Sequence, residues 1–154
     1  MKRGFTLIET LIYIAILAMV LSLAFAAVYQ LLDSDYRSVL LRELNENQLF
    51  LTQKIAWVLQ SNQSVNAPAV GSSGSSLSVN KIGYAYNPLV FSLSGGVVRL
   101  ASGATTTPIT NNYVIVNSLN FTHRVLSGQT IIEIDAVLFN KAATSTLDTS
   151  IIVK

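Results

Sequence analysis

Hydrophobic and polar residues follow three different patterns along the 154-residue chain. Residues 5–29 (FTLIETLIYIAILAMVLSLAFAAVY) are apolar at most positions. Residues 30–61 carry apolar residues at steps of three, four and seven, which places them on one face of a helix. Residues 82–154 contain short alternating runs that are typical of strands. Residues 62–81, between the last two regions, are rich in Ser, Asn and Gly and predict a loop.

The first two patterns predict one continuous helix from Phe5 to about Gln60. Gly and Pro, the residues that most often end helices, do not occur between Phe5 and Ala67. The half formed by residues 5–29 is apolar all round, and about 20 apolar residues are enough to span a bilayer. The half formed by residues 30–61 is amphipathic. Its apolar stripe consists of Leu32, Tyr36, Val39, Leu40, Leu44, Leu51, Ile55, Val58 and Leu59.

The alternating runs predict a small antiparallel sheet. The expected strands are IGYAY, LVFSLS, VVRLA, YVIVN, LNFTHRVL, TIIEIDAVLF and SIIVK. Two short turns, Ser94-Gly95-Gly96 and Ser127-Gly128, indicate hairpins, and hairpins join antiparallel strands. In residues 130–139 one face is apolar and the other carries Glu133 and Asp135. The apolar face consists of Ile132, Ile134, Ala136 and Leu138.

A sheet with one apolar face needs a cover, and the apolar stripe of the helix can provide it. We therefore expect an α+β fold, in which a long N-terminal helix packs on the sheet with Trp57 between them. The expected divisions are a membrane half at 5–29, an amphipathic half at 30–61, a loop at 62–81 and a β domain at 82–154.

The charges at the N-terminus predict the membrane orientation. Lys2 and Arg3 precede the apolar run, so the positive-inside rule places that end in the cytoplasm and the rest of the chain outside it. The alternative is a secretory signal cleaved at Ala24-Phe25-Ala26. The apolar run exceeds the usual 7–15 residues of a signal core, and Glu9 lies near its start, so we favour a retained helix.

Composition excludes several kinds of chemistry. The chain has no cysteine, which rules out disulfides and thiolate ligands. Its net charge is +2, and Lys2 and Arg3 account for the whole excess, so charge does not indicate nucleic-acid binding. His123 is the only histidine and is expected to be packed, while Glu133 and Asp135 are expected on a solvated face. We therefore predict no metal, no cofactor, no catalytic residue and no enzymatic activity.

Glu9 is the anomalous residue of the apolar run. A carboxylate in hydrocarbon costs roughly 2.5–3.5 kcal/mol on insertion scales. The next basic residue, Arg37, lies more than seven helical turns away at about 3.6 residues per turn. The side chain could reach the cytoplasmic surface, or it could pair with a positive group from another copy of the chain.

The residues from Lys2 to Glu9 (KRGFTLIE) resemble the processing motif of type IV prepilins and type II secretion pseudopilins. The resemblance implies a pilin-like form of the α+β fold and a leader at 1–4. It implies that a prepilin peptidase cuts between Gly4 and Phe5 and N-methylates Phe5. It also implies that Glu9 pairs with the N-terminal amine of a neighbouring subunit in a filament. Ala18, Ser22 and Ala26, spaced by four, form a small-residue face on which helices can approach closely.

The resemblance implies a structural subunit that is held in the cytoplasmic membrane and assembled into a cell-surface or periplasmic filament. Its partners would be other pilin or pseudopilin subunits, the prepilin peptidase, an assembly platform and, before assembly, the lipid bilayer. The C-terminal half resembles J-type minor pseudopilins and W-type minor pilins. The absence of Cys and the single acidic residue Asp148 near the C-terminus favour a minor subunit over a major one. The alternatives are an anchored β domain that binds a ligand without assembling, and an anchored enzyme.

Overall fold

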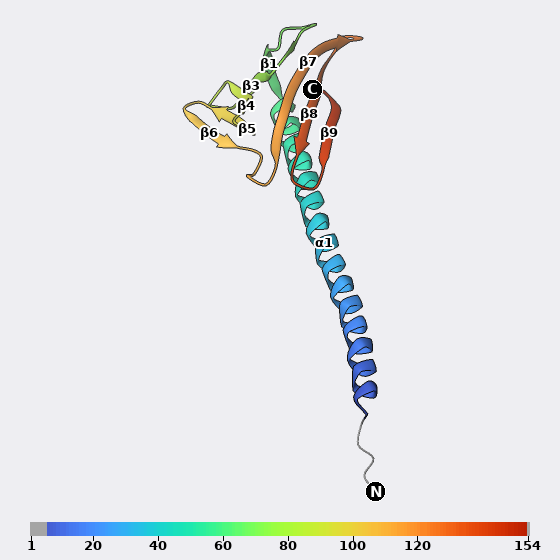
Figure 1. Ribbon diagram of the computed structural model, residues 1–154. Coiled ribbons are helices and arrows are strands. Elements are labelled where there is room, and N and C mark those ends of the chain that lie inside the picture. Colours follow the sequence, from blue (N-terminus) through green and yellow to red (C-terminus); the bar gives the residue numbers. More distant parts are fainter. Residues whose placement is uncertain (1–5, 154) are drawn as a thin grey trace. The chain divides into compact units, whose positions relative to one another are not determined.

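The computed structural model describes residues 6–153. The chain divides into two compact units, residues 1–39 and residues 40–154. One helix, α1 (Leu7–Leu59), belongs to the first unit up to Val39 and to the second from Leu40 onward. All of the described strands belong to the second unit (Figure 1).

Among residues 6–153, nine strands form two antiparallel sheets instead of the single small sheet that was expected. They are β1 (Asn62–Ala67), β2 (Ser73–Gly74), β3 (Ser76–Lys81), β4 (Leu89–Ser94), β5 (Val97–Ser102), β6 (Thr105–Pro108), β7 (Ile115–Leu126), β8 (Gln129–Phe139) and β9 (Thr144–Ile152). One sheet has the order β1-β3-β4-β5-β6, and the other has the order β2-β7-β8-β9. The predicted α+β, pilin-like class is confirmed.

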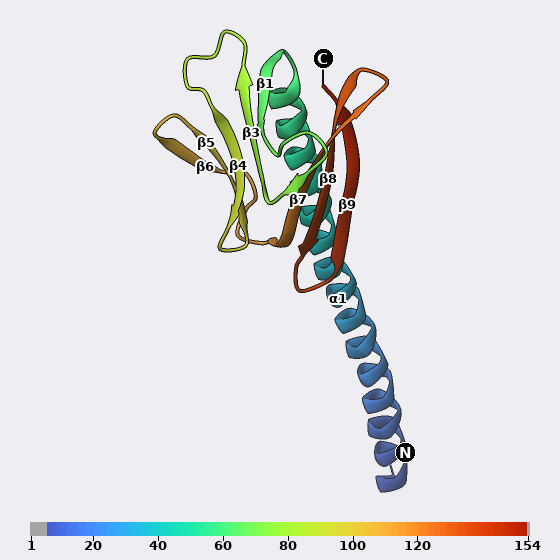
Figure 2. The same cartoon turned by 90° about the horizontal axis from the view of Figure 1, so that it is seen from above.

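The core of the second unit lies between the end of α1 and the two sheets (Figure 2). The helix contributes Leu44, Leu51, Ile55, Val58 and Leu59. The predicted stripe is therefore correct from Leu44 onward, but it was drawn too long. Its first three members, Leu32, Tyr36 and Val39, are exposed and belong to the first unit, in which no strand is described.

The predicted faces and turns of the sheets are confirmed. Ile132, Ile134, Ala136 and Leu138 are buried. The β4–β5 and β7–β8 hairpins turn through two residues each, because Ser94 pairs with Val97 and Leu126 with Gln129. Both turns need positive φ at each position, and the structure shows φ of 61° and 75° at Gly95 and Gly96. Ser127 and Gly128 have φ of 51° and 79°.

The loop expected at residues 62–81 is wrong, because the segment contains β1, β2 and β3. β3 alternates small polar residues with Leu77 and Val79, both of which are fully buried. It pairs with β1 on one side and with β4 on the other. The Ser and Asn residues that suggested a loop occupy only the outer face of β3. The apolar residues between them recur at every second position, and this alternation predicts a strand.

The strand expected at residues 82–86 (IGYAY) is also wrong, since these residues form turns. The Asn87 side chain takes the bonds that a neighbouring strand would supply. Its Oδ1 accepts from the Lys81 amide at 2.8 Å, and its Nδ2 donates to the carbonyls of Lys81 and Tyr84 at 2.8 and 3.0 Å. An Asn side chain that bonds to nearby backbone stabilises a turn in place of a strand.

Three further expectations need correction. YVIVN and LNFTHRVL form parts of the single strand β7, which has a register shift between Val116 and Ser118. β6 was not predicted, because its residues TTTP are all exposed and carry no apolar signal. Trp57 is not enclosed between helix and sheet. It is 39% exposed, and its ring meets the Tyr84 ring edge-on at 6.1 Å between centroids.

Lys81 stabilises the C-terminal end of α1. Its Nζ donates to the carbonyl oxygens of Trp57 and Gln60 at 2.7 and 2.5 Å, and it lies 4.8 Å from the centroid of the Trp57 ring. A cation at this position satisfies terminal carbonyls and complements the helix dipole.

We expect Lys81→Met to lower the free energy of unfolding by about 1–2 kcal/mol, because the stem remains and only the charged hydrogen bonds are lost. Thermal unfolding of the full chain in detergent, followed by the fluorescence of Trp57, measures the change. Lys141→Met is the matched control, since Lys141 is exposed. Equal stability of the two variants would show that the Lys81 contacts contribute nothing.

Candidate functional site

The first unit presents an apolar helix surface that no described part of that unit covers. Large hydrophobic side chains on all sides of the helix are exposed; they include Leu7, Ile8, Leu11, Ile12, Ile16, Leu17, Met19, Val20, Leu23 and Phe25. By length and composition, α1 could cross a membrane, and no residue in its most apolar stretch is buried. A helix that is hydrophobic all round is stable only in lipid or against other helices.

Glu9 lies in the first turn of this helix, where Thr6 acts as the N-cap. The Glu9 amide donates to the carbonyl of Thr6 at 3.1 Å and approaches its Oγ1 at 3.4 Å. Thr followed three residues later by Glu is the capping-box pattern. The sequence interpretation overlooked this role, although the pattern was readable in TLIE. Negative charge is also favoured at a helix N-terminus, by about 0.3–1 kcal/mol.

The Glu9 carboxylate has no ion-pair partner among residues 6–153. Arg37, the next basic residue along the chain, is already paired. Its Nε lies 2.9 Å from Oδ2 of Asp33, one turn away. No other charged residue lies between Glu9 and Asp33. The observed capping bonds use the backbone amide of Glu9 and not its carboxylate. The helix N-terminus favours a negative charge at this position but does not neutralise it.

Ala18, Ser22 and Ala26 all lie exposed on one face of the helix. The Ser22 hydroxyl donates to the Ala18 carbonyl at 2.7 Å. This bond satisfies the hydroxyl inside the helix, so the face can enter an apolar environment without an unpaired donor. The face therefore carries small side chains, and its serine hydroxyl is hydrogen-bonded within the helix. The remaining predicted site residues, Lys2, Arg3, Gly4 and Phe5, lie outside the described residues.

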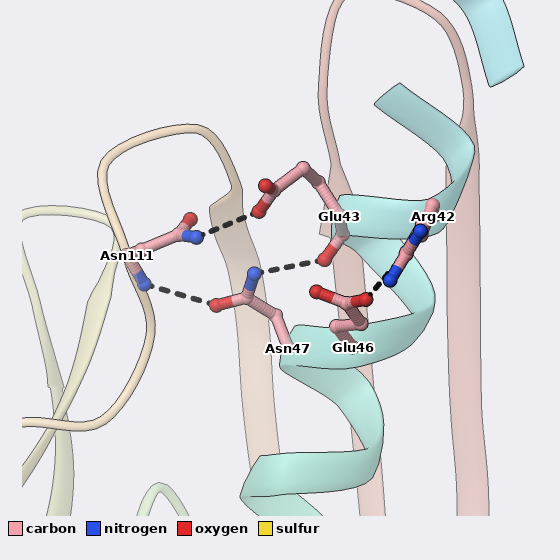
Figure 3. Close-up of polar contacts among 5 residues, drawn as sticks. All are labelled: Arg42, Glu43, Glu46, Asn47 and Asn111. Atoms are coloured by element: carbon pink, nitrogen blue, oxygen red, sulfur yellow. Dashed lines mark hydrogen bonds and ion pairs between the residues drawn. The ribbon is translucent and has the colours of Figure 1, made fainter. Parts of the chain in front are cut away.

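A second polar cluster joins α1 to the loop before β7 (Figure 3). Asn47, only 6% exposed, accepts from the Asn111 amide at 2.9 Å and donates to the Glu43 carbonyl at 2.8 Å. The Asn111 side chain donates to Oε2 of Glu43 at 2.9 Å. A buried role for Asn47 was not predicted from the sequence, because the predicted stripe contains Leu44 and then Leu51 and omits the residues between them. Since these amides have partners, the cluster fixes the loop to the helix.

Arg42 and Glu46, one helical turn apart, form an ion pair with Nε and Oε1 2.7 Å apart (Figure 3). The hydrogen bond from Arg42 to Glu46, and the negative charge of that carboxylate, raise the pKa of the Arg42 guanidinium above its usual value. Arg42 is exposed, so the pair is screened by solvent and contributes little to stability.

Three ionisable residues of the sheets, His123, Arg124 and Glu133, have structural partners. His123 is 4% exposed, and its Nδ1 lies 2.9 Å from the Pro68 carbonyl oxygen, which confirms a packed histidine. Glu133 pairs with Arg124 at 3.0 Å. In the described part of the chain no three His, Cys, Asp or Glu side chains come together in a way that could hold a metal ion.

An exposed apolar helix with a capped, charged first turn fits a membrane-anchored protein. Residues 1–25 match the family model for the prokaryotic N-terminal methylation motif. This match supports a type IV prepilin-like protein, and the motif indicates a pilin or pseudopilin that is processed by a peptidase. Proteins with this motif are structural and associate with other pilins. No curated protein and no solved structure matches the chain.

Proposed function

We propose that the protein is a minor pilin or pseudopilin, a structural subunit of a type IV pilus-like filament or a type II secretion pseudopilus. The observation that carries the proposal is that the Glu9 carboxylate lacks an ion-pair partner in the described part of the chain. It is a carboxylate without a cation among residues 6–153, on a helix that is apolar all round, within a matched methylation motif. Such a charge needs a partner from outside the described chain.

Processing would create that partner. A prepilin peptidase would cut between Gly4 and Phe5, remove the leader that contains Lys2 and Arg3, and methylate the new amine of Phe5. An α-amine has a reference pKa of about 7.7–8.0, so it is largely protonated at neutral pH. It would then pair with Glu9 of a neighbouring subunit. Phe5 and Glu9 are four positions apart in the sequence, which in helical geometry would correspond to a rise of about 6 Å and would set an axial offset between subunits.

Assembly would replace lipid by other helices around the first half of α1. Before assembly the helix would lie in the cytoplasmic membrane, with the second unit outside the cytoplasm. An assembly platform in the membrane would then add the subunit to a filament. The face formed by Ala18, Ser22 and Ala26 would allow the helices to approach closely, because small side chains bring backbones together.

The mass of the mature N-terminus tests the proposed processing. We expect intact-mass and N-terminal peptide analysis to find a chain that begins at methylated Phe5. Coexpression with an inactive peptidase is the control and should leave residues 1–4 in place. A mature chain that retains Met1 despite an active peptidase, or that begins after Ala26, would contradict the proposal.

The alternative function is an anchored β domain that binds a ligand without entering a filament. It has in its favour that nine of the ten described elements belong to the second unit. Under this alternative, substitutions at Gly4 and Glu9 would leave function unchanged.

A further inference from the structure

A cavity of about 370 Å³ in the second unit is lined by residues of both sheets. β1 contributes Asn62 and Gln63, β7 contributes His123, and the start of β8 contributes Gln129 and Thr130. The volume is at the lower end of the range of roughly 300–1,000 Å³ that is usual for small-ligand sites. The cavity belongs to the second unit, whereas the proposed function refers to the helix surface of the first unit.

Several polar side chains around the cavity are not used by the fold. The side chains of Asn62, Gln63, Gln129 and Thr130 make no hydrogen bond to any other described residue. Ser64, which also lines the cavity, does have partners: its hydroxyl bonds to Asn66 and to Asn80. Each amide offers both an oxygen acceptor and an NH₂ donor, and Thr130 offers a hydroxyl. Donors and acceptors of both kinds therefore face one space from two different sheets.

His123, another residue of the lining, carries a buried acceptor. Because the Pro68 carbonyl can only accept, Nδ1 of the imidazole is the donor in their 2.9 Å contact. When the ring carries one proton, Nε2 is then a bare acceptor. It is buried and has no partner, and no other buried side-chain nitrogen or oxygen among residues 6–153 is in that state. An unsatisfied buried polar group costs about 1–3 kcal/mol, so a ligand donor there would be favourable.

The lining also restricts the charge and shape of a ligand. No described residue that lines the cavity is charged, so an ion would lose its hydration without gaining a counter-charge. Val65, Val70 and Val153 supply apolar contacts between the polar groups. A ligand with many hydroxyls, apolar C–H faces and no net charge matches this lining.

We propose that this cavity binds a neutral saccharide of one or two rings. The amides of Gln63 and Gln129 bond sugar hydroxyls from opposite sheets, and the valines contact the C–H face. A third hydroxyl donates to Nε2 of His123. That atom is screened from solvent in the structure, so this bond requires a small side-chain adjustment of the kind that is common on binding.

The test uses the full chain in a zwitterionic detergent that contains no sugar, with galactose, N-acetylglucosamine and lactose as probes. Saturation-transfer NMR measures binding. Because His123 is the only histidine, ¹⁵N-labelled imidazole gives a single Nε2 signal. We expect at least one probe to bind and to shift that signal. Gln129→Ala should weaken binding about tenfold, the equivalent of one lost hydrogen bond of roughly 1.4 kcal/mol.

Gln53→Ala is the matched control, because Gln53 is an exposed glutamine of α1 that does not line the cavity. It should bind the same probe as tightly as the unmodified chain. The proposal is overturned if none of the three probes binds at millimolar concentration, or if Gln129→Ala and Gln53→Ala bind equally well. Equal affinity for the charged sugar N-acetylneuraminic acid would also overturn it, by showing that the cavity does not select neutral ligands.

Discussion

Glu9→Ala is expected to leave the protein in the membrane but to remove it from filaments, with incorporation reduced about a hundredfold or more. The physical reason is that the N-terminal amine of the neighbouring subunit would lose the carboxylate that neutralises it. Removing one partner of a buried ion pair costs about 3–5 kcal/mol, and each 1.4 kcal/mol changes an equilibrium tenfold. Membrane insertion should persist, since the helix loses a carboxylate and keeps its apolar residues. Immunoblots of sheared filaments and of membranes measure the two pools.

A second variant separates ion pairing from helix capping. Gln is accepted at the third helical position of a capping box, so Glu9→Gln retains that role and removes only the charge. We expect it to fail in assembly as Glu9→Ala does. Asp33→Ala is the control: it breaks the exposed pair with Arg37, which should be worth at most about 1 kcal/mol. Normal incorporation of Glu9→Gln would show that capping, and not charge, explains this residue.

Phe121→Ala is expected to lower the free energy of unfolding of the second unit by about 3–5 kcal/mol. The ring is fully buried on β7, in the core that α1 shares with both sheets. Truncation removes its contacts and leaves a cavity in a close-packed interior. For a unit of this size the change corresponds to roughly 10–25 °C in the unfolding temperature. The fluorescence of Trp57 in the full chain follows the transition.

Val125→Ala is the control on the same strand, because Val125 is exposed and its truncation opens no internal cavity. We expect a change within about 0.5 kcal/mol, as for most surface substitutions. A loss of stability at Val125 equal to that at Phe121 would show that strand propensity, and not burial, dominates in β7. If Phe121→Ala unfolds no more easily than the unmodified chain, the described core is wrong.

The predictions from sequence succeeded where the signal is local and repeated. The α1 helix, the buried face of β8 and the two-residue hairpins follow from periodicity and turn chemistry, which act over a few neighbouring residues. The predictions failed where we considered composition but not the spacing of the apolar residues. β3 was taken for a loop because Ser and Asn mark its outer face, although Leu77 and Val79 alternate with them.

The candidate sites likewise could be predicted from sequence only where their residues lie close together in the chain. The motif around Glu9 was visible in eight consecutive residues, and a family model confirms the motif over residues 1–25. The Asn47–Asn111 contact joins residues 64 positions apart, and the cavity joins Asn62 of β1 to His123 and Gln129 of the distant β7–β8 hairpin. No pattern within one segment predicts which polar side chains will meet after folding.

By itself the sequence determined the helix, the alternating strands and the prepilin-like N-terminus, because each depends on residues close together in the chain. Only the tertiary structure decided that the strands divide into two sheets. It also decided that the helix stripe is buried only from Leu44 onward, that Asn47 anchors a loop, and that His123 keeps an unpaired nitrogen. These features depend on which distant segments pack together, and packing selects partners by fit and by hydrogen-bond satisfaction across the whole core.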